Sequence, residues 1–70
     1  MPEIVFTSHA LLRLAQRSLS KEDVFEVIYR PSFTRKSILG RTIASKKLGA
    51  EYREVVYVNE KDKIVVITVY

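Results

Sequence analysis

The sequence predicts an α+β domain in which two N-terminal helices pack on one face of a four-stranded, mainly antiparallel sheet, with room for a short extra N-terminal strand. Three observations predict this arrangement. Apolar residues recur with the period of a helix as far as residue 29, and from Phe33 the period changes toward the value of two that strands show. The 70 residues, of which 47% are hydrophobic, suffice for one domain, residues 1–70, with one thin core.

The N-terminal segment predicts a strand followed by a helix. Ile4-Val5-Phe6 is a short apolar run that fits a brief strand or an arm packed on the core. Thr7 or Ser8 can cap the next helix, which runs to about Arg17. At about 100° per residue, this helix has a buried stripe and a polar arc. The predicted stripe consists of Leu11, Leu14 and Ala15, and the arc consists of His9, Arg13, Gln16 and Arg17.

A second helix is predicted from about Lys21 to Tyr29. Ser20 and Asp23 have the spacing of a capping box, with Asp in place of the usual Glu. Arg30-Pro31 ends the helix, because a residue before proline disfavours the helical conformation. The apolar stripe of this helix consists of Val24, Phe25, Val27 and Ile28.

Strand candidates follow the helices and are separated by turn signals. They are residues 33–38, 42–48, 52–58 and 63–70. Turns are expected near Gly40, at Gly49-Ala50 and in the polar loop 59–62. The last strand is apolar at both alternating sets of positions, which predicts a central or well-covered strand. The strands are therefore expected to form an antiparallel meander.

The composition excludes several classes of function. The chain has no cysteine, which excludes a disulfide framework and a thiolate zinc site, and a single histidine disfavours any other metal site, so no metal or cofactor is expected. The apolar runs are strand-sized, so no membrane span is expected. Met1-Pro2-Glu3 lacks the features of a signal peptide, and the default location is the cytoplasm. High Lys and Glu content is a feature of proteins from thermophiles.

The charge distribution favours a polyanionic or acidic partner. Twelve Lys and Arg against eight Asp and Glu give a net charge of +4, and most of the excess falls in residues 30–53. Four residues there form a candidate patch for nucleic-acid phosphates, namely Arg41, Lys46, Lys47 and Arg53. A solvated edge that discourages strand pairing explains these residues equally well.

The first predicted helix carries a candidate anion site. Arginine supplies forked donors for phosphate, and histidine is the side chain that exchanges protons near neutral pH. The polar arc holds the only histidine, His9, together with Arg13 and Arg17. It therefore has the groups that phosphate chemistry needs, although the solvated side of any amphipathic helix is also charged.

Three motifs together resemble a widespread family of small prokaryotic domains of unknown function. They are Ser8-His9-Ala10-x-x-Arg13-x-x-x-Arg17, Leu19-Ser20-x-Glu22-Asp23-Val24 and Ile64-Val65-Val66-Ile67-Thr68-Val69-Tyr70. That family looks related to the RelE-like toxins and, more distantly, to barnase-like and colicin-type ribonucleases. The resemblance implies a RelE-like fold, metal-independent RNA cleavage and the role of the toxin in a toxin–antitoxin pair. The partners that it implies are RNA and an acidic antitoxin protein.

By motif match, the resemblance implies roles for His9, Arg13, Arg17 and Thr68. Metal-free RNA cleavage needs a base for the 2′-hydroxyl proton, cations for the charged phosphorane and an acid for the leaving oxygen. His9 would be the base or the acid, and Arg13 or Arg17 would clamp the phosphate. Thr68 or Tyr70 would add a hydroxyl group. The sheet residues that such toxins use do not align with this chain, and the glycine that often precedes the Leu19-Ser20 motif is missing.

Each candidate residue also has a purely structural interpretation. His9 could hydrogen-bond a nearby loop, the arginines could pair with acidic residues, and Thr68 could be an ordinary strand residue. The tyrosines could stack on bases or lie half-buried in the sheet, and they are Tyr29, Tyr52, Tyr57 and Tyr70. Three functions stay open: a RelE-like ribonuclease, a non-catalytic RNA- or DNA-binding domain, and a module that docks an acidic protein. Self-pairing into a homodimer through an edge strand is a further option.

Overall fold

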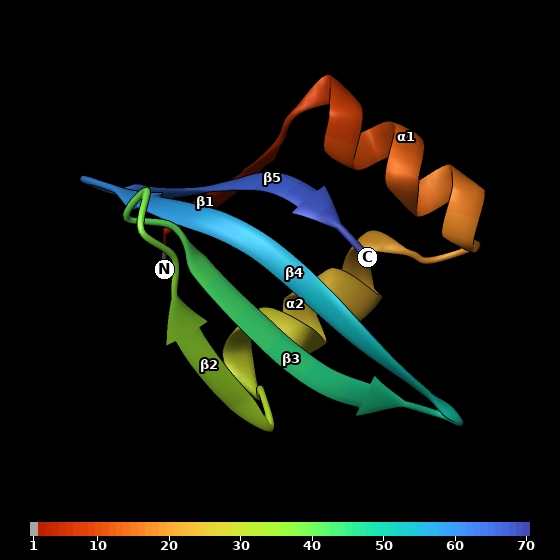
Figure 1. The fold of residues 1–70 in the computed structure, drawn as a ribbon. Helices are drawn as coiled ribbons and strands as arrows, with labels where there is room; N and C mark the ends of the chain where they lie inside the picture. The colour runs from red at the N-terminus through yellow and green to blue at the C-terminus, as the bar shows by residue number, and fades with distance from the viewer. Residues whose placement is uncertain (1) are drawn as a thin grey trace.

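Five strands form one mixed sheet, and two helices pack on it, in the computed structural model, which describes residues 2–70 (Figure 1). The elements in chain order are β1 (Glu3–Phe6), α1 (Ser8–Arg17), α2 (Lys21–Tyr29), β2 (Phe33–Lys36), β3 (Thr42–Leu48), β4 (Glu51–Glu60) and β5 (Lys63–Val69). The strand order is β1-β5-β4-β3-β2. Strands β2 to β5 form the expected antiparallel meander, and the short β1 pairs in parallel with β5. The predicted α+β class is therefore confirmed, with the extra N-terminal strand present.

The hairpin turns explain where the strand bounds differ from the predicted ones. β2 ends at Lys36 rather than at residue 38, because the Ser37 hydroxyl accepts hydrogen bonds from the backbone N–H groups of Leu39 and Arg41. β4 extends to Glu60, so the expected four-residue loop is wrong and only residues 61–62 form the turn. The predicted bounds of β3 are confirmed.

Local capping interactions define α2. The Ser20 hydroxyl accepts a hydrogen bond from the Asp23 backbone N–H at 3.1 Å, and the Asp23 carboxylate accepts one from the Ser20 N–H at 2.9 Å. This reciprocal pair is the predicted capping box. The predicted bounds of α2 are confirmed as well.

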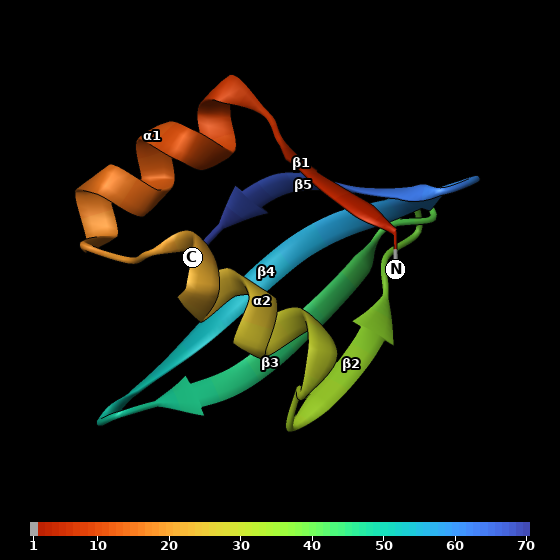
Figure 2. The same ribbon diagram turned by 180° about the vertical axis from the view of Figure 1, so that it is seen from behind.

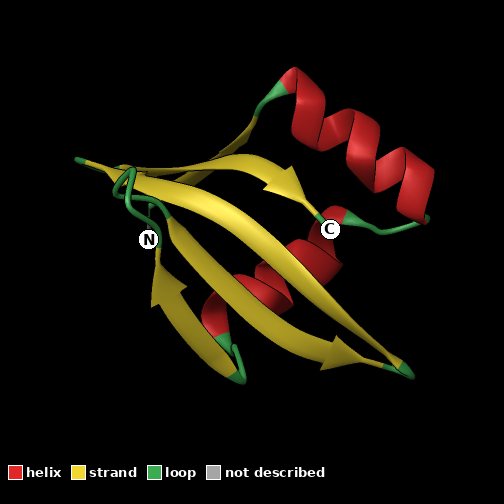
Figure 3. Cartoon of the chain, viewed as in Figure 1, coloured by secondary structure: helices red, strands yellow, loops and turns green. Residues whose placement is uncertain are grey.

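One face of the sheet is covered and carries the core. Helix α2 packs against β3 and β4, and it lies in front of them when the sheet is seen from behind (Figure 2). The buried cluster joins residues of both helices to the covered face: Ala10, Leu14, Val24, Val27, Ile28, Ala44, Val55, Tyr57, Ile64, Val66 and Val69. Figure 3 shows the opposite face toward the viewer, with α2 behind the strands. We call this opposite side the uncovered face. Neither helix in residues 2–70 has the length and apolarity of a membrane-spanning helix.

Helix α1 buries a different stripe from the predicted one. Of the predicted stripe only Leu14 is buried, together with Ala10, whereas Leu11 is 45% exposed and Ala15 is exposed as well. Leu12, which lies outside the predicted stripe, is 55% exposed. The reason is the position of α1, which contacts β5 and β1 near the edge of the sheet and so buries only a narrow stripe. Arg13 and Arg17 flank that stripe and are partly buried.

Thr7 connects β1, α1 and β5. Its backbone N–H donates to the Val66 carbonyl at 3.1 Å and continues the β1–β5 ladder. Its hydroxyl accepts a hydrogen bond from the Ala10 N–H at 3.1 Å, as the N-cap of α1, and donates one to the Ile67 carbonyl at 2.9 Å. One side chain therefore starts the helix and ties that start to β5.

Replacing Thr7 tests this connection. The Thr7→Val variant loses both side-chain hydrogen bonds, so we expect the free energy of unfolding to fall by about 1–3 kcal/mol in urea titrations. Thr7→Ser keeps the hydroxyl and should lose less than about 1 kcal/mol. Equal stability of the two variants would contradict the assigned role.

Burial raises the pKa of the Tyr57 phenol above its ordinary value of 10.0. The unfolded chain therefore loses this proton at lower pH than the folded chain, and stability should fall as the pH rises above about 10. The Tyr57→Phe variant lacks the titration. We expect its free energy of unfolding to change relative to wild type only above about pH 10, in favour of the variant. A constant difference across the alkaline range would exclude this contribution.

Candidate active site

A β-bulge in β5 changes the direction of the last side chains of the chain. Val56 pairs with Thr68 and the next residue, Tyr57, pairs with Val66, so Ile67 is an extra residue on β5. Such a bulge interrupts the strict alternation of side chains and is a recurrent feature next to active sites.

The bulge places Thr68 and Tyr70 on the uncovered face. Val66 and Val69 are three residues apart, yet both belong to the core. Thr68, which lies between the bulge residue Ile67 and Val69, therefore points to the opposite face of the sheet. Tyr70 pairs with Glu54 through two backbone hydrogen bonds of 2.8 and 3.4 Å, and Glu54 lies next to the core residue Val55 in β4. Without the bulge, residues 68 and 70 would share the covered face with Val66.

Helix α1 runs beside this part of β5. Strand β1 ends at Phe6, opposite Val66, and α1 then occupies the space next to the last residues of β5 (Figures 1 and 2). The helix is held there by Thr7. The N-terminal motif and the C-terminal motif of the sequence therefore meet at one junction.

Arg13 contacts both sides of the junction. Its Nε donates a long hydrogen bond of 3.5 Å to Nε2 of His9, one helical turn earlier. Its Cζ lies 5.7 Å from the centre of the Tyr70 ring, which is a cation–π contact. In this contact Nε2 of His9 is the acceptor. His9 is exposed, so a ligand can reach this nitrogen and replace the weak bond.

Two buried polar atoms lie on the same two elements. The Thr68 hydroxyl, in a residue that is 8% exposed, and Nε of Arg17 have no hydrogen-bond partner among residues 2–70. A buried polar group without a partner costs about 1–3 kcal/mol.

The arginines of α1 are not neutralised by acidic residues. The ion pairs among residues 2–70 join Arg35 to Glu54, Lys46 to Glu26, Arg53 to Glu51 and Lys63 to Glu60. Arg13 and Arg17 take part in none of these, so the alternative in which they pair with carboxylates is not observed in the described part of the chain. Their charge is available to an anion.

The structure does not bring the four residues of the predicted basic patch together. Lys46 and Arg53 are opposite each other in the register of β3 and β4, and both lie on the covered face. There the Lys46 ammonium group donates a hydrogen bond to the Arg30 carbonyl at 2.7 Å. Lys47 lies on the uncovered face near the end of β3. Arg41 comes directly before the first residue of β3, at the opposite end of the strand. Only Lys47 lies on the uncovered face near the end of the sheet that carries Tyr70.

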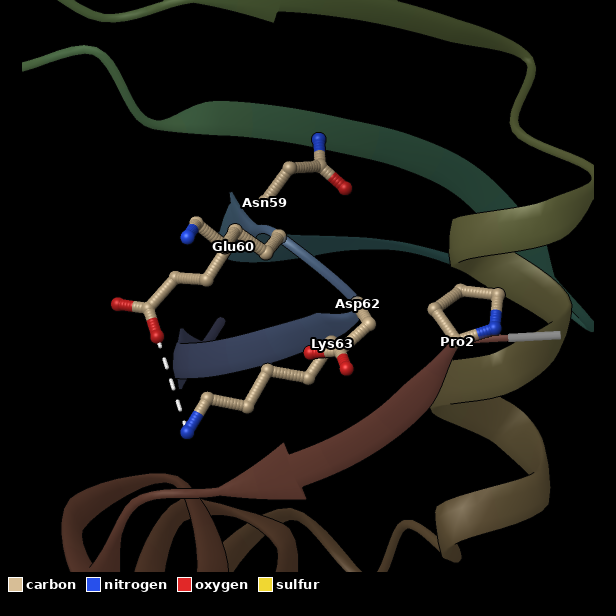
Figure 4. Close-up of a pocket in the computed structure, with 6 residues that line it drawn as sticks. Pro2, Asn59, Glu60, Asp62 and Lys63 are labelled. Atoms are coloured by element: carbon tan, nitrogen blue, oxygen red, sulfur yellow. Dashed lines mark ion pairs between the residues drawn. The ribbon is translucent and has the colours of Figure 1, made fainter.

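Two hollows of the surface lie outside the junction. One of about 420 Å³ lies between Pro2 and the β4–β5 turn and is lined by Asn59, Glu60, Lys61, Asp62 and Lys63, with the Glu60–Lys63 ion pair at its side (Figure 4). Another of about 510 Å³ is lined by α2 residues that include Glu22, Glu26 and Tyr29. Neither contains a candidate residue of the α1–β5 junction. Within residues 2–70, no three His, Asp or Glu side chains are grouped to bind a metal ion.

Sequence reasoning missed the bulge and the side of the sheet that it selects. Residues 64–69 consist of β-branched residues alone, so no position in the run marks the bulge. The predicted polar arc did place His9 and Arg13 on the same side of the helix, where the structure shows them in contact.

Comparison with known proteins gives a family match that spans most of the chain. No curated protein and no solved structure matches the sequence significantly. The profile of a family described as "Domain of unknown function (DUF4258)" matches residues 6–70. The matched region includes both helices and every candidate residue of the junction. The expected membership of a family of unknown function is confirmed, and the chain belongs to the DUF4258 family.

Proposed function

We propose that this protein is a metal-independent ribonuclease of the RelE-like toxin type, with its active site at the α1–β5 junction. The observation that carries the proposal is the double contact of Arg13, with the His9 imidazole on one side and the Tyr70 ring on the other. Arg13 thereby brings together an imidazole from α1 and a phenol from the end of β5, and Arg17 and Thr68 lie on the same two elements. These are the groups that metal-free cleavage of RNA requires.

In the proposed reaction, the 2′-hydroxyl of a ribose attacks the adjacent phosphorus. Nε2 of His9 takes the hydroxyl proton, after the substrate has replaced its weak bond to Arg13. The guanidinium groups of Arg13 and Arg17 donate to the non-bridging oxygens and stabilise the charge of the phosphorane. The bond from phosphorus to the 5′-oxygen breaks, and the Tyr70 hydroxyl donates a proton to that oxygen. The products are a 2′,3′-cyclic phosphate and a 5′-hydroxyl end.

Thr68 has a supporting role in this proposal. Its hydroxyl is buried and lacks a partner among residues 2–70, so in this proposal it donates to the phosphate only after the substrate displaces the side chains that cover it. Once uncovered, such a donor is fixed in place by the strand and needs no further reorganisation during the reaction.

An alternative is a domain that binds RNA without cleaving it. It is favoured by the surroundings of His9, whose one hydrogen bond among residues 2–70 comes from Arg13 and not from an orienting carboxylate.

A protein partner is a further part of the toxin hypothesis. Leu11 and Leu12 point outward from α1 and offer an apolar surface to an acidic antitoxin.

Replacing His9 separates cleavage from binding. We expect purified protein to cleave single-stranded RNA in the presence of EDTA, and His9→Gln to slow cleavage by about 10²–10⁴-fold, because glutamine keeps a hydrogen-bond partner for Arg13 but exchanges no proton. Gln16→Ala, on the same helix, is the control and should cleave at the wild-type rate. Binding without cleavage by the wild-type protein would favour the non-catalytic alternative.

Replacing Arg13 tests the phosphate contact. Arg13→Ala should weaken RNA binding and should lower the slope of log K against log salt by about 0.7, the value for one contact with a single strand. Arg30→Ala, an exposed arginine at the end of α2, is the matched control. Fluorescence anisotropy over a salt series measures both slopes. If the two variants lost affinity equally, Arg13 would have no specific role.

A further inference from the structure

The uncovered face carries an aromatic residue and a lysine opposite each other next to the junction. Tyr52 of β4 and Lys47 of β3 are register partners. They lie three residues from the core residues Val55 and Ala44, so their side chains are on the uncovered face. Tyr52 is 61% exposed and Lys47 is exposed.

Neither side chain has an evident structural task. Among residues 2–70, neither Tyr52 nor Lys47 makes a side-chain hydrogen bond or an ion pair, in contrast to the adjacent residues Lys46 and Arg53, which do both. The nearby Glu54 carboxylate on the same face is engaged by Arg35 at 3.4 Å and by the Ser45 hydroxyl at 3.2 Å. The lysine charge is therefore not cancelled locally.

The pair continues the candidate active site across the sheet. Tyr70 is paired with Glu54, and Tyr52 lies two residues before Glu54 on the same face. Tyr52 and Tyr70 are therefore diagonal neighbours, about 7–8 Å apart between their Cα atoms. A path leads from Arg13 over Tyr70 to Tyr52 and then to Lys47, with cations at both ends and aromatic rings between them.

We propose that Tyr52 and Lys47 form a nucleotide subsite for single-stranded RNA. The base next to the cleaved phosphodiester stacks on the Tyr52 ring, and Lys47 binds the phosphate of that nucleotide. Stacking on an exposed aromatic ring needs an unpaired base, whereas the bases of a duplex have their faces covered. This subsite gives the substrate class of the ribonuclease proposed above and rests on that proposal.

Binding of a non-cleavable RNA tests the subsite. The probe is a fluorescently labelled 2′-O-methyl RNA single strand, which lacks the attacking hydroxyl, and its affinity is measured by anisotropy. We expect Tyr52→Ala to bind about tenfold more weakly and Tyr52→Phe, which keeps the ring, to bind within about twofold of wild type. Lys47→Ala should lower the salt slope by about 0.7. The same RNA in a duplex should bind more weakly than the single strand.

Two control variants match these changes. Tyr29→Ala removes a tyrosine that is 44% exposed on α2, and Lys61→Ala removes an exposed lysine of the β4–β5 turn. Both should bind like wild type. The subsite is refuted if Tyr52→Ala binds as well as Tyr29→Ala, if Tyr52→Phe is as weak as Tyr52→Ala, or if the duplex binds as tightly as the single strand.

A cleavage assay separates the two proposals. Cleavage that depends on His9 but is insensitive to Tyr52→Ala would refute the subsite and leave the ribonuclease standing. Loss of binding in Tyr52→Ala, without any cleavage by wild type, would refute the ribonuclease and support the subsite as part of an RNA-binding surface. Circular dichroism checks that each variant is folded, and the exposure of Tyr52 predicts that it is.

Discussion

The arrangement of the candidate site depends on the Thr7 hydroxyl, which makes one hydrogen bond within α1 and one with β5. It accepts from Ala10 and donates to Ile67, the residue that forms the bulge. The helix start and the irregular part of the strand are therefore fixed to each other by a single side chain. The start of the helix determines the positions of His9 and Arg13, and the bulge determines the face on which Tyr70 lies. The approach of Arg13 to the Tyr70 ring is the geometric result.

The position of α1 at the edge of the sheet also explains which of its residues are buried and which are exposed. At the edge, only Ala10 and Leu14 reach the core, while the arginines flank the buried stripe and the other two leucines of α1 point outward. The cationic groups are therefore held against the last strand by partly buried side chains.

Local signals in the sequence were sufficient to predict both ends of α2, but they were insufficient to predict the geometry of the α1–β5 junction. Ser20 and Asp23 cap the helix and Pro31 follows it, so both ends are encoded within a few residues. The bulge at Ile67 has no such signal, because every residue of 64–69 favours a strand equally. Lys46 and Lys47 show the same limit. They are adjacent in a strand and therefore lie on opposite faces of β3, but only the strand register shows which of the two lies on the covered face.

The central claim is that RNA binds where α1 meets the end of β5 and continues over Tyr52. Titration of isotope-labelled protein with a 2′-O-methyl RNA single strand, followed by two-dimensional NMR of the backbone amides, tests this claim most directly. We expect the largest shift changes in residues 8–17, 47–54 and 67–70. Changes concentrated in α2 or in the β4–β5 turn, with α1 and the end of β5 unaffected, would contradict it.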